Sequence, residues 1–475
     1  AFSEDVAARF AGLGWHVVTV EDANDVAALD AALASFRACQ DRPTLVIVRS
    51  VIGYGSPNKA NSHEAHGAPL GDEEIRLTKR AYGWPEDQQF LVPDGVREHF
   101  AEGIGARGRQ LHADWAAKFA LYEATHPQLA ADLKRIWARE LPDGWDKDIP
   151  VFPADAKGVA SRVSSGQVLN AVAKNVPWLI GGSADLAPSN NTMLKVDKAG
   201  HFSAKDHGGR NLHFGIREHS MAAICNGLAL SGLRPYGGTF FVFTDYMRPS
   251  MRLAAMMHQP VLYVLTHDSI GLGEDGPTHQ PVEHLAACRG IPGLLVFRPG
   301  DANEVAEAYR KILATPNRPA ALVLTRQNIP TVDRSICEAA SGVARGGYVL
   351  LDAPGGHPDV ILIGTGSELS LCVEAQQKLA AEGIRARVVS LPCWALFDEQ
   401  DPAYRDRVLP PQITARVAVE AGIRQGWDRY IGSRGRFVGM SGFGASGPFK
   451  QLYEHFGITA AQVAAQAKAA LADKL

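Results

Sequence analysis

The stretch PVLYVLTH, residues 260–267, is the feature that most constrains the fold of this chain. It is apolar from 260 to 265, without the polar alternation of a strand that has one face in water. A continuous apolar strand is typical of a parallel sheet that helices cover on both faces. Other apolar runs alternate with helical periodicity along the chain, so the sequence predicts an α/β protein with parallel sheets.

The length and this alternation together predict several domains. The chain has 475 residues, which exceeds the size at which a single hydrophobic core stops growing. Three α/β stretches and one helical stretch rich in Trp, Ala and charge can be distinguished. The predicted domains are 1–92, a helical connector 93–150, 151–330 and 331–475. Helices are expected at 3–13, 24–38 and 162–174 and after Asp72 and Arg217, and strands at 16–20, 44–50, 211–215 and 260–267.

The composition makes nucleic-acid and membrane partners poor expectations. The net charge is −3 and no basic stripe is visible. No apolar run approaches the ~18 residues that would span a bilayer. The six cysteines form no Cys-x-x-Cys pair, which suits reduced thiols, and the first residues lack the pattern of a signal peptide. We therefore expect a cytoplasmic protein with neither nucleic acid nor a membrane as partner.

Titratable side chains are concentrated in THDSIGLGEDGPTHQP, residues 266–281, directly after the apolar run. A metal site is one interpretation, but a glycine and a proline separate Asp275 from His279, and zinc sites favour compact cysteine or paired-histidine spacings. A polar turn at the end of a buried strand is the second. The pattern favours a third: a loop in which His267, Asp275 and His279 read a small hydroxylated, anionic ligand.

Four further side chains would suit such a ligand. His66 lies on a glycine-bounded loop, and Ser189 lies in LAPSNN. Arg162 stands near a helix start, and Arg326 ends the strand ALVLTR. Guanidinium groups and hydroxyls at helix ends are common phosphate ligands. Taken singly, each residue is more often a surface or capping residue, but their shared position after predicted strands favours a phosphate clamp.

Glu218 and three aromatic residues form another candidate group. Glu218 lies in the first turn of an Ala-rich helix, where the helix dipole alone favours a carboxylate. Phe240, Phe243 and Tyr246 follow at every third position, a spacing more often found in core packing. Aromatic faces beside a buried acid would also hold a flat heteroaromatic ring, by stacking and through one ring nitrogen.

The third α/β stretch offers one glycine-rich turn, GTGSE at 364–368, between a predicted strand and helix. Such a turn could hold a phosphate on a helix N-terminus, but a plain structural turn is the favoured interpretation.

Five stretches, in order along the whole chain, closely resemble the transketolases, thiamine-diphosphate enzymes of sugar-phosphate metabolism. They are IGYGSPNKANSHEAHGAPL, GGSADLAPSNNT, HFGIREHSMAAICNG, GGTFFVFTDYMRPSMRLAAMMHQPVLYVLTHDSIGLGEDGPTHQPVEHLA and RQN. The resemblance implies three doubly wound α/β domains of mainly parallel sheets flanked by helices. These would be the thiamine-diphosphate-binding fold twice, with the first copy incomplete, and a C-terminal α/β domain. A homodimer with shared active sites is also implied.

The resemblance implies roles around the cofactor. Glu218 matches the glutamate that hydrogen-bonds the aminopyrimidine ring and so promotes removal of the thiazolium C2 proton. His66 matches a histidine between the cofactor diphosphate and the donor sugar, and Asp185 matches an acid near the cofactor at the subunit interface. The pocket around the pyrimidine ring is matched by Phe240, Phe243 and Tyr246.

The same resemblance implies roles around the substrate. Asp275 matches a group that reads the C2 hydroxyl of the donor, His279 meets the sugar, and His267 lies nearer its phosphate. The clamp on that phosphate is matched by Arg162, Ser189 and Arg326. The implied catalytic residues are Glu218, His66 and His267, and no residue of the chain is expected to ligate a metal.

The implied reaction is the reversible transfer of a two-carbon ketol unit through a thiamine-diphosphate carbanion. The donor is a ketose phosphate such as xylulose 5-phosphate, and the acceptor is an aldose phosphate such as ribose 5-phosphate or erythrose 4-phosphate. Transferases of this kind act in carbohydrate metabolism, in the pentose phosphate pathway and the Calvin cycle, and use Mg²⁺ or Ca²⁺ beside the cofactor.

One family motif is absent. The family binds its metal and diphosphate with a Gly-Asp-Gly run followed by an asparagine, and these 475 residues contain no Gly-Asp-Gly. The resemblance places that motif upstream of residue 1, so we expect the metal ligands and the front of the first domain to lie outside this sequence. Two alternatives stay open: a truncated, non-catalytic protein that acts in subunit association, and a relative with a different small aldehyde acceptor.

Overall fold

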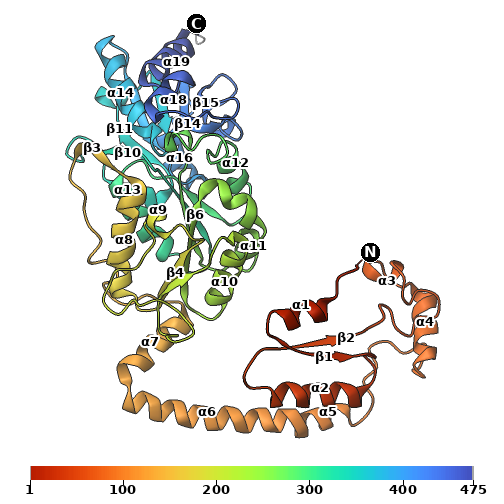
Figure 1. Ribbon diagram of the computed structural model, residues 1–475. Helices are drawn as coiled ribbons and strands as arrows, with labels where there is room; N and C mark the ends of the chain where they lie inside the picture. The colour runs from red at the N-terminus through yellow and green to blue at the C-terminus, as the bar shows by residue number, and fades with distance from the viewer. Residues whose placement is uncertain (1, 473–475) are drawn as a thin grey trace. The chain divides into compact units, whose positions relative to one another are not determined.

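The computed structural model describes residues 2–472, which form two compact units, residues 2–119 and 120–472 (Figure 1). The boundary between the units falls within α6 (Ala106–Thr125), one of the helices that fill much of the predicted connector. The other helical segments there are α5 (Val96–Phe100), the π-helical segment Ala101–Gly105 and α7 (Pro127–Ala138).

The first unit contains a two-stranded parallel sheet of β1 and β2. Its first two helices begin at aspartates, because the carboxylates of Asp5 and Asp25 each accept a backbone N–H at 2.9 Å. Apart from α3, a short helix in a stretch that the sequence predicts as a loop, the elements agree with the expected helices and strands to within a few residues. They are α1 (Val6–Gly12), β1 (His16–Val20), α2 (Val26–Ala38), β2 (Thr44–Val48), α3 (Glu64–Gly67) and α4 (Asp72–Ala81).

A six-stranded, wholly parallel sheet forms the first half of the second unit, in the order β5-β4-β6-β7-β9-β8. Every residue of β7, the strand of the long apolar run, is buried, which confirms the prediction of a parallel sheet covered on both faces. The strands are β4 (Leu179–Ser183), β5 (Asn211–His213), β6 (Arg234–Phe240), β7 (Leu262–Thr266), β8 (Leu295–Phe297) and β9 (Ala320–Leu324).

The two faces of this sheet pack against different helices, as a doubly wound fold requires. Leu262 and Val264 of β7 share a core with α8 and α13, whereas Tyr263 and Leu265 share another with α10 and α11. This alternation follows from the two-residue period of a strand. The helices are α8 (Ser161–Asn175), α9 (Ala187–Asn190), α10 (Glu218–Leu230), α11 (Thr244–Met256), α12 (His284–Arg289) and α13 (Ala302–Leu313).

A five-stranded sheet forms the C-terminal half of the second unit, in the order β11-β13-β12-β14-β15. Only the edge strand β11 is antiparallel to its neighbour, so the sheet is mainly parallel, as expected. The strands are β11 (Tyr348–Leu351), β12 (Val360–Gly364), β13 (Ala386–Ser390), β14 (Arg416–Ile423) and β15 (Arg436–Met440). The helices are α14 (Glu368–Ala381), α15 (Trp394–Asp398), α16 (Pro402–Val408), α17 (Asp428–Ile431), α18 (Phe449–His455) and α19 (Ala460–Ala472).

A small antiparallel pair, β3 (Asp155–Ala160) with β10 (Asn328–Thr331), was not expected from the sequence. Neither segment carries a clear apolar alternation, and Gly158 and Pro330 are poor strand residues.

Among residues 2–472, none of the helices is both long enough and apolar enough to cross a bilayer.

Candidate active site

Four neighbouring strands of the six-stranded sheet lead into residues singled out in the sequence. Asp185 and Ser189 follow β4, and Phe240 ends β6. His267 directly follows β7, and Arg326 comes two residues after β9. Because β4, β6, β7 and β9 are adjacent and parallel, these residues meet at the carboxyl edge of the sheet. Doubly wound sheets bind their ligands at such an edge.

His267 is a buried, neutral imidazole at this edge. Its ring stacks on Phe240 with centroids 3.7 Å apart, and its Nδ1 lies 2.9 Å from the hydroxyl of Thr266. Burial, followed by the nearby charges of Arg162, Arg326 and His279, lowers the pKa of His267 to about 3. Because Nδ1 already pairs with Thr266, Nε2 can donate or accept one hydrogen bond with a ligand.

Two guanidinium groups lie close to this imidazole. Arg162, in the first turn of α8, donates from Nη1 to the carbonyl oxygen of Ser189 at 2.7 Å. Burial, and then the charge of Arg326, lowers the pKa of Arg162, so the two cations are near enough to repel each other. Neither arginine has an acidic partner among the ion pairs of residues 2–472, and the buried Nε of Arg162 has no hydrogen-bond partner there. Uncompensated guanidinium groups of this kind suit a phosphate.

The three aromatic residues form one continuous wall. Phe240 stacks nearly parallel to Phe243 with centroids 5.9 Å apart, and Phe243 contacts Tyr246 at 6.0 Å. Phe240 ends β6, Phe243 ends a 3₁₀ turn (Phe241–Phe243), and Tyr246 lies in the first turn of α11, so three elements supply one surface. Tyr246 is 65% exposed, so the wall is open at one end rather than sealed in the core. An accessible aromatic wall can stack on a flat ring.

Glu218 is a buried carboxylate without a protein partner. It opens α10, which packs against α11 and β6, and only 7% of its surface is exposed. Within the described part of the chain its carboxylate forms neither a hydrogen bond nor an ion pair. Its oxygens are not among the fully buried polar atoms without a partner, so they keep some contact with solvent and are open to a ligand that can hydrogen-bond them.

The loop 266–281 brings His279 to the aromatic wall. The His279 ring meets Phe240 and Phe243 edge to face, with centroids 6.3 and 5.7 Å away. Asp275 lies on an exposed turn of the same loop. The structure thus gathers His267 and His279 with the aromatic residues and leaves Asp275 at the surface beside them.

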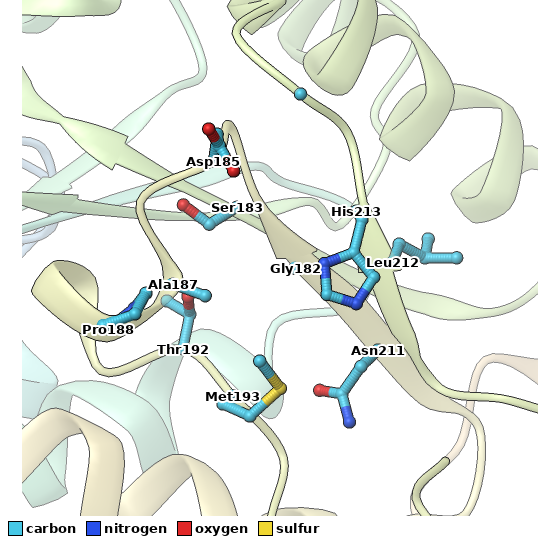
Figure 2. Close-up of a pocket in the computed structure, with 11 residues that line it drawn as sticks. Gly182, Ser183, Asp185, Ala187, Pro188, Thr192, Met193, Asn211, Leu212 and His213 are labelled. Atoms are coloured by element: carbon cyan, nitrogen blue, oxygen red, sulfur yellow. The ribbon is translucent and has the colours of Figure 1, made fainter. Parts of the chain in front are cut away.

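Asp185 is one of the residues that line a cavity of about 250 Å³ (Figure 2). It is exposed and has φ = 61°, a left-handed conformation that residues other than glycine rarely adopt. Thr192 and His213 also line the cavity, and the buried hydroxyl of Thr192 makes no hydrogen bond within residues 2–472. The neighbouring Asn190, fully buried, has both amide atoms without a partner there. The sequence pointed to Asp185 but gave no signal for these two polar groups.

His66 belongs to the first unit, so its predicted place in the site stays a prediction. It is exposed in the last turn of α3. The loop before this helix is anchored by buried Glu74, which accepts hydrogen bonds from the hydroxyl of Ser56 and from the amide and side chain of Asn58.

Asp268 is an acid whose role the sequence did not distinguish. It stands between His267 and Ser269 in the titratable loop, but it is 1% exposed and binds Arg298 through Oδ2 at 2.7 and 3.0 Å. Its position directly after a buried strand was the one available signal. Asp268 is therefore a structural partner of Arg298 and not a group that faces a ligand.

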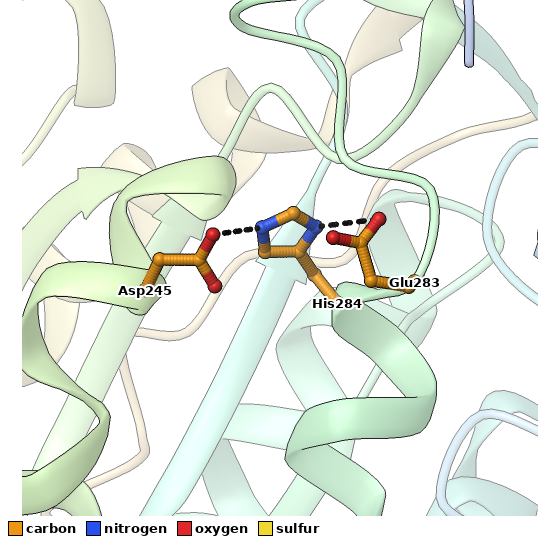
Figure 3. A group of neighbouring side chains, drawn as sticks. All are labelled: Asp245, Glu283 and His284. Atoms are coloured by element: carbon orange, nitrogen blue, oxygen red, sulfur yellow. Dashed lines mark ion pairs between the residues drawn. The ribbon is translucent and has the colours of Figure 1, made fainter.

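A further group, Asp245, His284 and Glu283, lies on the α11 and α12 side of the sheet (Figure 3). Nε2 of His284 is 3.3 Å from Asp245 and Nδ1 is 3.8 Å from Glu283, yet neither nitrogen has hydrogen-bond geometry to any described residue. One ligand atom of each residue lies within 4.8 Å of the others, but the two carboxylates pair with different ring nitrogens, and we assign no metal to the group.

Three family descriptions match the chain. They are "Transketolase, thiamine diphosphate binding domain" over residues 1–142, "Transketolase, pyrimidine binding domain" over 157–332 and "Transketolase-like TK C-terminal domain" over 346–459.

Proteins similar to this chain carry the same name. A transketolase of Geobacillus stearothermophilus is 50% identical over 472 residues, which are 99% of this chain and 70% of the relative. A chloroplastic transketolase of Solanum tuberosum is 49% identical over 98% of this chain and 63% of the relative. The crystal structure of a Pichia stipitis transketolase in complex with sedoheptulose 7-phosphate superimposes with a TM-score of 0.92 at 39% identity, over 99% of this chain and 69% of that chain. The chain thus spans between 63% and 70% of the length of these three proteins.

Proposed function

Because this chain belongs to the transketolase family, we propose that it transfers a two-carbon ketol unit reversibly from a ketose phosphate to an aldose phosphate, with thiamine diphosphate as cofactor. The observation that carries the proposal is the arrangement at the carboxyl edge of the six-stranded sheet. A pair of unneutralised guanidinium groups, a neutral buried imidazole and an open aromatic wall meet there, and a partnerless carboxylate opens the helix packed beside them.

The residues present fit the pyrimidine half of the cofactor. Phe240, Phe243 and Tyr246 would stack on its flat ring, and Glu218 would hydrogen-bond a ring nitrogen, which would give this buried carboxylate the partner that the protein does not supply. Thiamine diphosphate, when bound, supplies the electron sink that allows a carbon–carbon bond next to a carbonyl to break. The part of Glu218 in that chemistry is to hold or release a proton at the ring nitrogen.

The opposite end of the site suits the phosphate of the sugar. Arg162 and Arg326 would neutralise it, and the hydroxyl of Ser189, adjacent to the carbonyl that holds Arg162, would add a hydrogen bond. His267 would donate or accept one hydrogen bond from Nε2 without adding charge. His279 and Asp275 would read hydroxyls of the sugar between the two ends.

Several parts of the proposal rest on the family likeness alone. His66 and Asp185 would lie near the cofactor, and the active sites would be shared in a homodimer. Mg²⁺ or Ca²⁺ would accompany the diphosphate, but no residue of this chain is assigned as its ligand. The predicted domains 1–92, 93–150, 151–330 and 331–475, a cytoplasmic location, and a place in the pentose phosphate pathway or Calvin cycle belong to the same proposal.

The first experiment measures ketol transfer from xylulose 5-phosphate to ribose 5-phosphate with thiamine diphosphate and Mg²⁺. It uses two proteins: the 475-residue polypeptide alone, and the same polypeptide extended by the part of the Geobacillus relative that the match does not cover. We expect turnover with the extended protein. Failure of both to turn over any ketose phosphate, with both folded, would contradict the proposed function and favour a role in subunit association. A panel of small aldehydes as acceptors tests the remaining alternative.

A second experiment tests the phosphate clamp. Arg326→Met removes one charge-assisted hydrogen bond, worth roughly 1.5–3 kcal/mol, and should raise the KM for xylulose 5-phosphate by about tenfold or more. The KM for erythrulose, a ketose without phosphate, should stay unchanged. Arg385→Met, at an exposed arginine paired with Asp359 in the C-terminal half, is the matched control. An equal rise for both ketoses would contradict the clamp.

A further inference from the structure

A guanidinium group already occupies the glycine-rich turn GTGSE at 364–368, so the turn is not free to bind a phosphate. Arg298 donates from Nη1 to the carbonyl oxygen and hydroxyl of Thr365 at 3.0 and 3.1 Å and forms an ion pair with Glu368. The backbone N–H of Gly366 donates to the carbonyl oxygen of Arg298 at 2.9 Å. A Cβ at Gly366 would lie 2.6 Å from Cζ of Arg298, so only glycine admits the side chain this closely.

Arg298 comes from the other sheet of the second unit and connects the two halves. It follows β8 of the six-stranded sheet, whereas the turn joins β12 to α14 of the C-terminal sheet. The other side of its guanidinium group binds Asp268, the residue next to His267. All three charged side chains, Asp268, Arg298 and Glu368, are completely buried.

Glu368 is held firmly in its own half. Its carboxylate accepts hydrogen bonds from the hydroxyl of Tyr453 at 2.7 Å, from the amide of Ala421 at 2.9 Å and from the hydroxyl of Ser367 at 2.7 Å. The chain of contacts therefore runs from fixed groups of the C-terminal sheet, through Glu368 and Arg298, to the first residues of the loop 267–281.

The far end of this loop is also attached to the C-terminal half. The side-chain amide of Gln280 donates to the carbonyl oxygen of Ala445 at 2.9 Å and to that of Gly273 at 3.0 Å. The hydroxyl of Ser446 donates to the carbonyl oxygen of Glu274 at 2.5 Å. The segment 445–446 thus holds both the tip and the end of the loop.

The loop needs such support because its backbone starts in a disfavoured conformation. His267 has φ = 62°, a left-handed value that persists in residues with a side chain only where the surroundings enforce it. Asp268, tied to Arg298, fixes the backbone immediately after this residue.

We propose that the C-terminal half of this chain holds the loop 267–281 in the conformation that binds the donor sugar, with Asp268, Arg298 and Glu368 as positioning residues. The proposal rests on the function proposed above for the part that concerns the sugar. It assigns the C-terminal sheet a role that its sequence did not indicate. It also explains why the turn 364–368 contains a glycine and an acid.

Two variants of different severity test this assignment. Glu368→Gln keeps the volume but removes the charge that holds Arg298, and Ser446→Ala removes a single exposed hydroxyl that holds the loop tip. Asp352→Asn is the matched control, because Asp352 also pairs with a buried arginine of the C-terminal half, Arg387, but does not contact the loop. All are made in the extended protein used in the first experiment, which contains the whole 475-residue chain.

The decisive readout is amide hydrogen exchange in residues 266–281, measured without substrate. We expect faster exchange there in Glu368→Gln and in Ser446→Ala, with β12 and β14 unchanged in Ser446→Ala and no change in the loop in Asp352→Asn. The KM for xylulose 5-phosphate should rise by about tenfold in Glu368→Gln, with a smaller change in kcat.

Unchanged loop exchange in both variants would overturn the proposal. Exchange that quickens equally throughout the C-terminal half in Glu368→Gln, with wild-type KM, would mean that the buried charges serve stability only and would also overturn it. The exchange measurement does not depend on activity. If the unmodified protein turned over no ketose phosphate, the proposed function would fail while the support of the loop could still be decided.

Discussion

Glu218 opens α10 and is the acid on which the proposed reaction depends. Its place in the first turn of a helix had an ordinary explanation in the helix dipole. The structure adds that the side chain is 7% exposed and lacks a protein partner within residues 2–472, and neither property can be read from neighbouring letters. Burial without a partner depends on which distant elements pack around the residue.

We predict that Glu218→Gln lowers kcat by about 10²- to 10⁴-fold, because an amide cannot hold and release the proton that the proposed reaction needs. The KM for the ketose phosphate should change little, since the arginine clamp is untouched. Thermal stability should stay close to that of the wild type, because glutamine has nearly the same volume and Glu218 has no protein partner to lose within residues 2–472. Steady-state kinetics at saturating thiamine diphosphate and a melting curve check both parts. A wild-type kcat would refute the role of Glu218.

His267 leads to a prediction about pH. Its pKa is lowered to about 3 in the folded protein, against about 6.5 in an unfolded chain, so the unfolded state binds one more proton between these values. The contribution of His267 to the free energy of unfolding should therefore be complete above pH ~6.5. As the pH falls below this value, the free energy of unfolding should decrease by up to about 1.4 kcal/mol per pH unit because of this group. Urea unfolding at several pH values between 4 and 7 should show a shallower loss in His267→Gln. The same pH dependence in both proteins would contradict a buried neutral imidazole.

At the scale of elements, the sequence predicted those with a strong period and missed those held by context. The apolar run at 260–267 became β7, and the predicted helices at 24–38 and 162–174 became α2 and α8 with small changes at their ends. The strand β6, RPYGGTF, was not predicted, because a proline and two glycines are poor strand residues. Its residues do not favour a strand by themselves, but its glycines let neighbouring side chains pack closely against its backbone.

The glycines of β6 give an element-scale prediction. A Cβ at Gly238 would lie 2.8 Å from Cγ2 of Thr192 and 3.2 Å from Nδ2 of Asn190, in the segment that carries Ser189. Gly238→Ala should therefore lower the free energy of unfolding by about 1–3 kcal/mol through overpacking and weaken binding of the ketose phosphate. Gly227→Ala is the control, because a Cβ at this exposed position within α10 meets nothing within 4 Å and a helix favours alanine by about 1 kcal/mol. Chemical denaturation of both variants checks the prediction, and equal stabilities would contradict it.

At the scale of the whole molecule, sequence patterns reached the fold class and the grouping of candidate residues at one sheet edge. Parallel strands place their carboxyl ends at one edge of the sheet, so residues as distant in sequence as Ser189 and Arg326 can be grouped from the sequence alone. The buried chain of Asp268, Arg298 and Glu368 could not be predicted, because it joins three places far apart in sequence. Asp268 and Glu368 lie in motifs that suggested a ligand, and nothing in the sequence indicates that both pair with Arg298 instead. Long-range pairing of single charges leaves no periodic signal.

The two units differ in how well each can support itself, and this yields the last prediction. Among residues 2–119, the only buried apolar side chains are Val20 and Ala32, and α2 exposes Val26, Leu33 and Phe36 by 76%, 48% and 50%. A two-stranded sheet without a core is marginal in water, whereas β7 lies in a sheet buried on both faces. In the 475-residue polypeptide at high dilution, the amides of β1 and β2 should therefore exchange with solvent orders of magnitude faster than those of β7. Hydrogen exchange read by mass spectrometry on peptides 16–20, 44–48 and 262–266 measures this directly. Equal protection of the three strands would show that other surfaces cover the apolar face of α2, and protection of β1 that rises with protein concentration would trace that cover to association between chains.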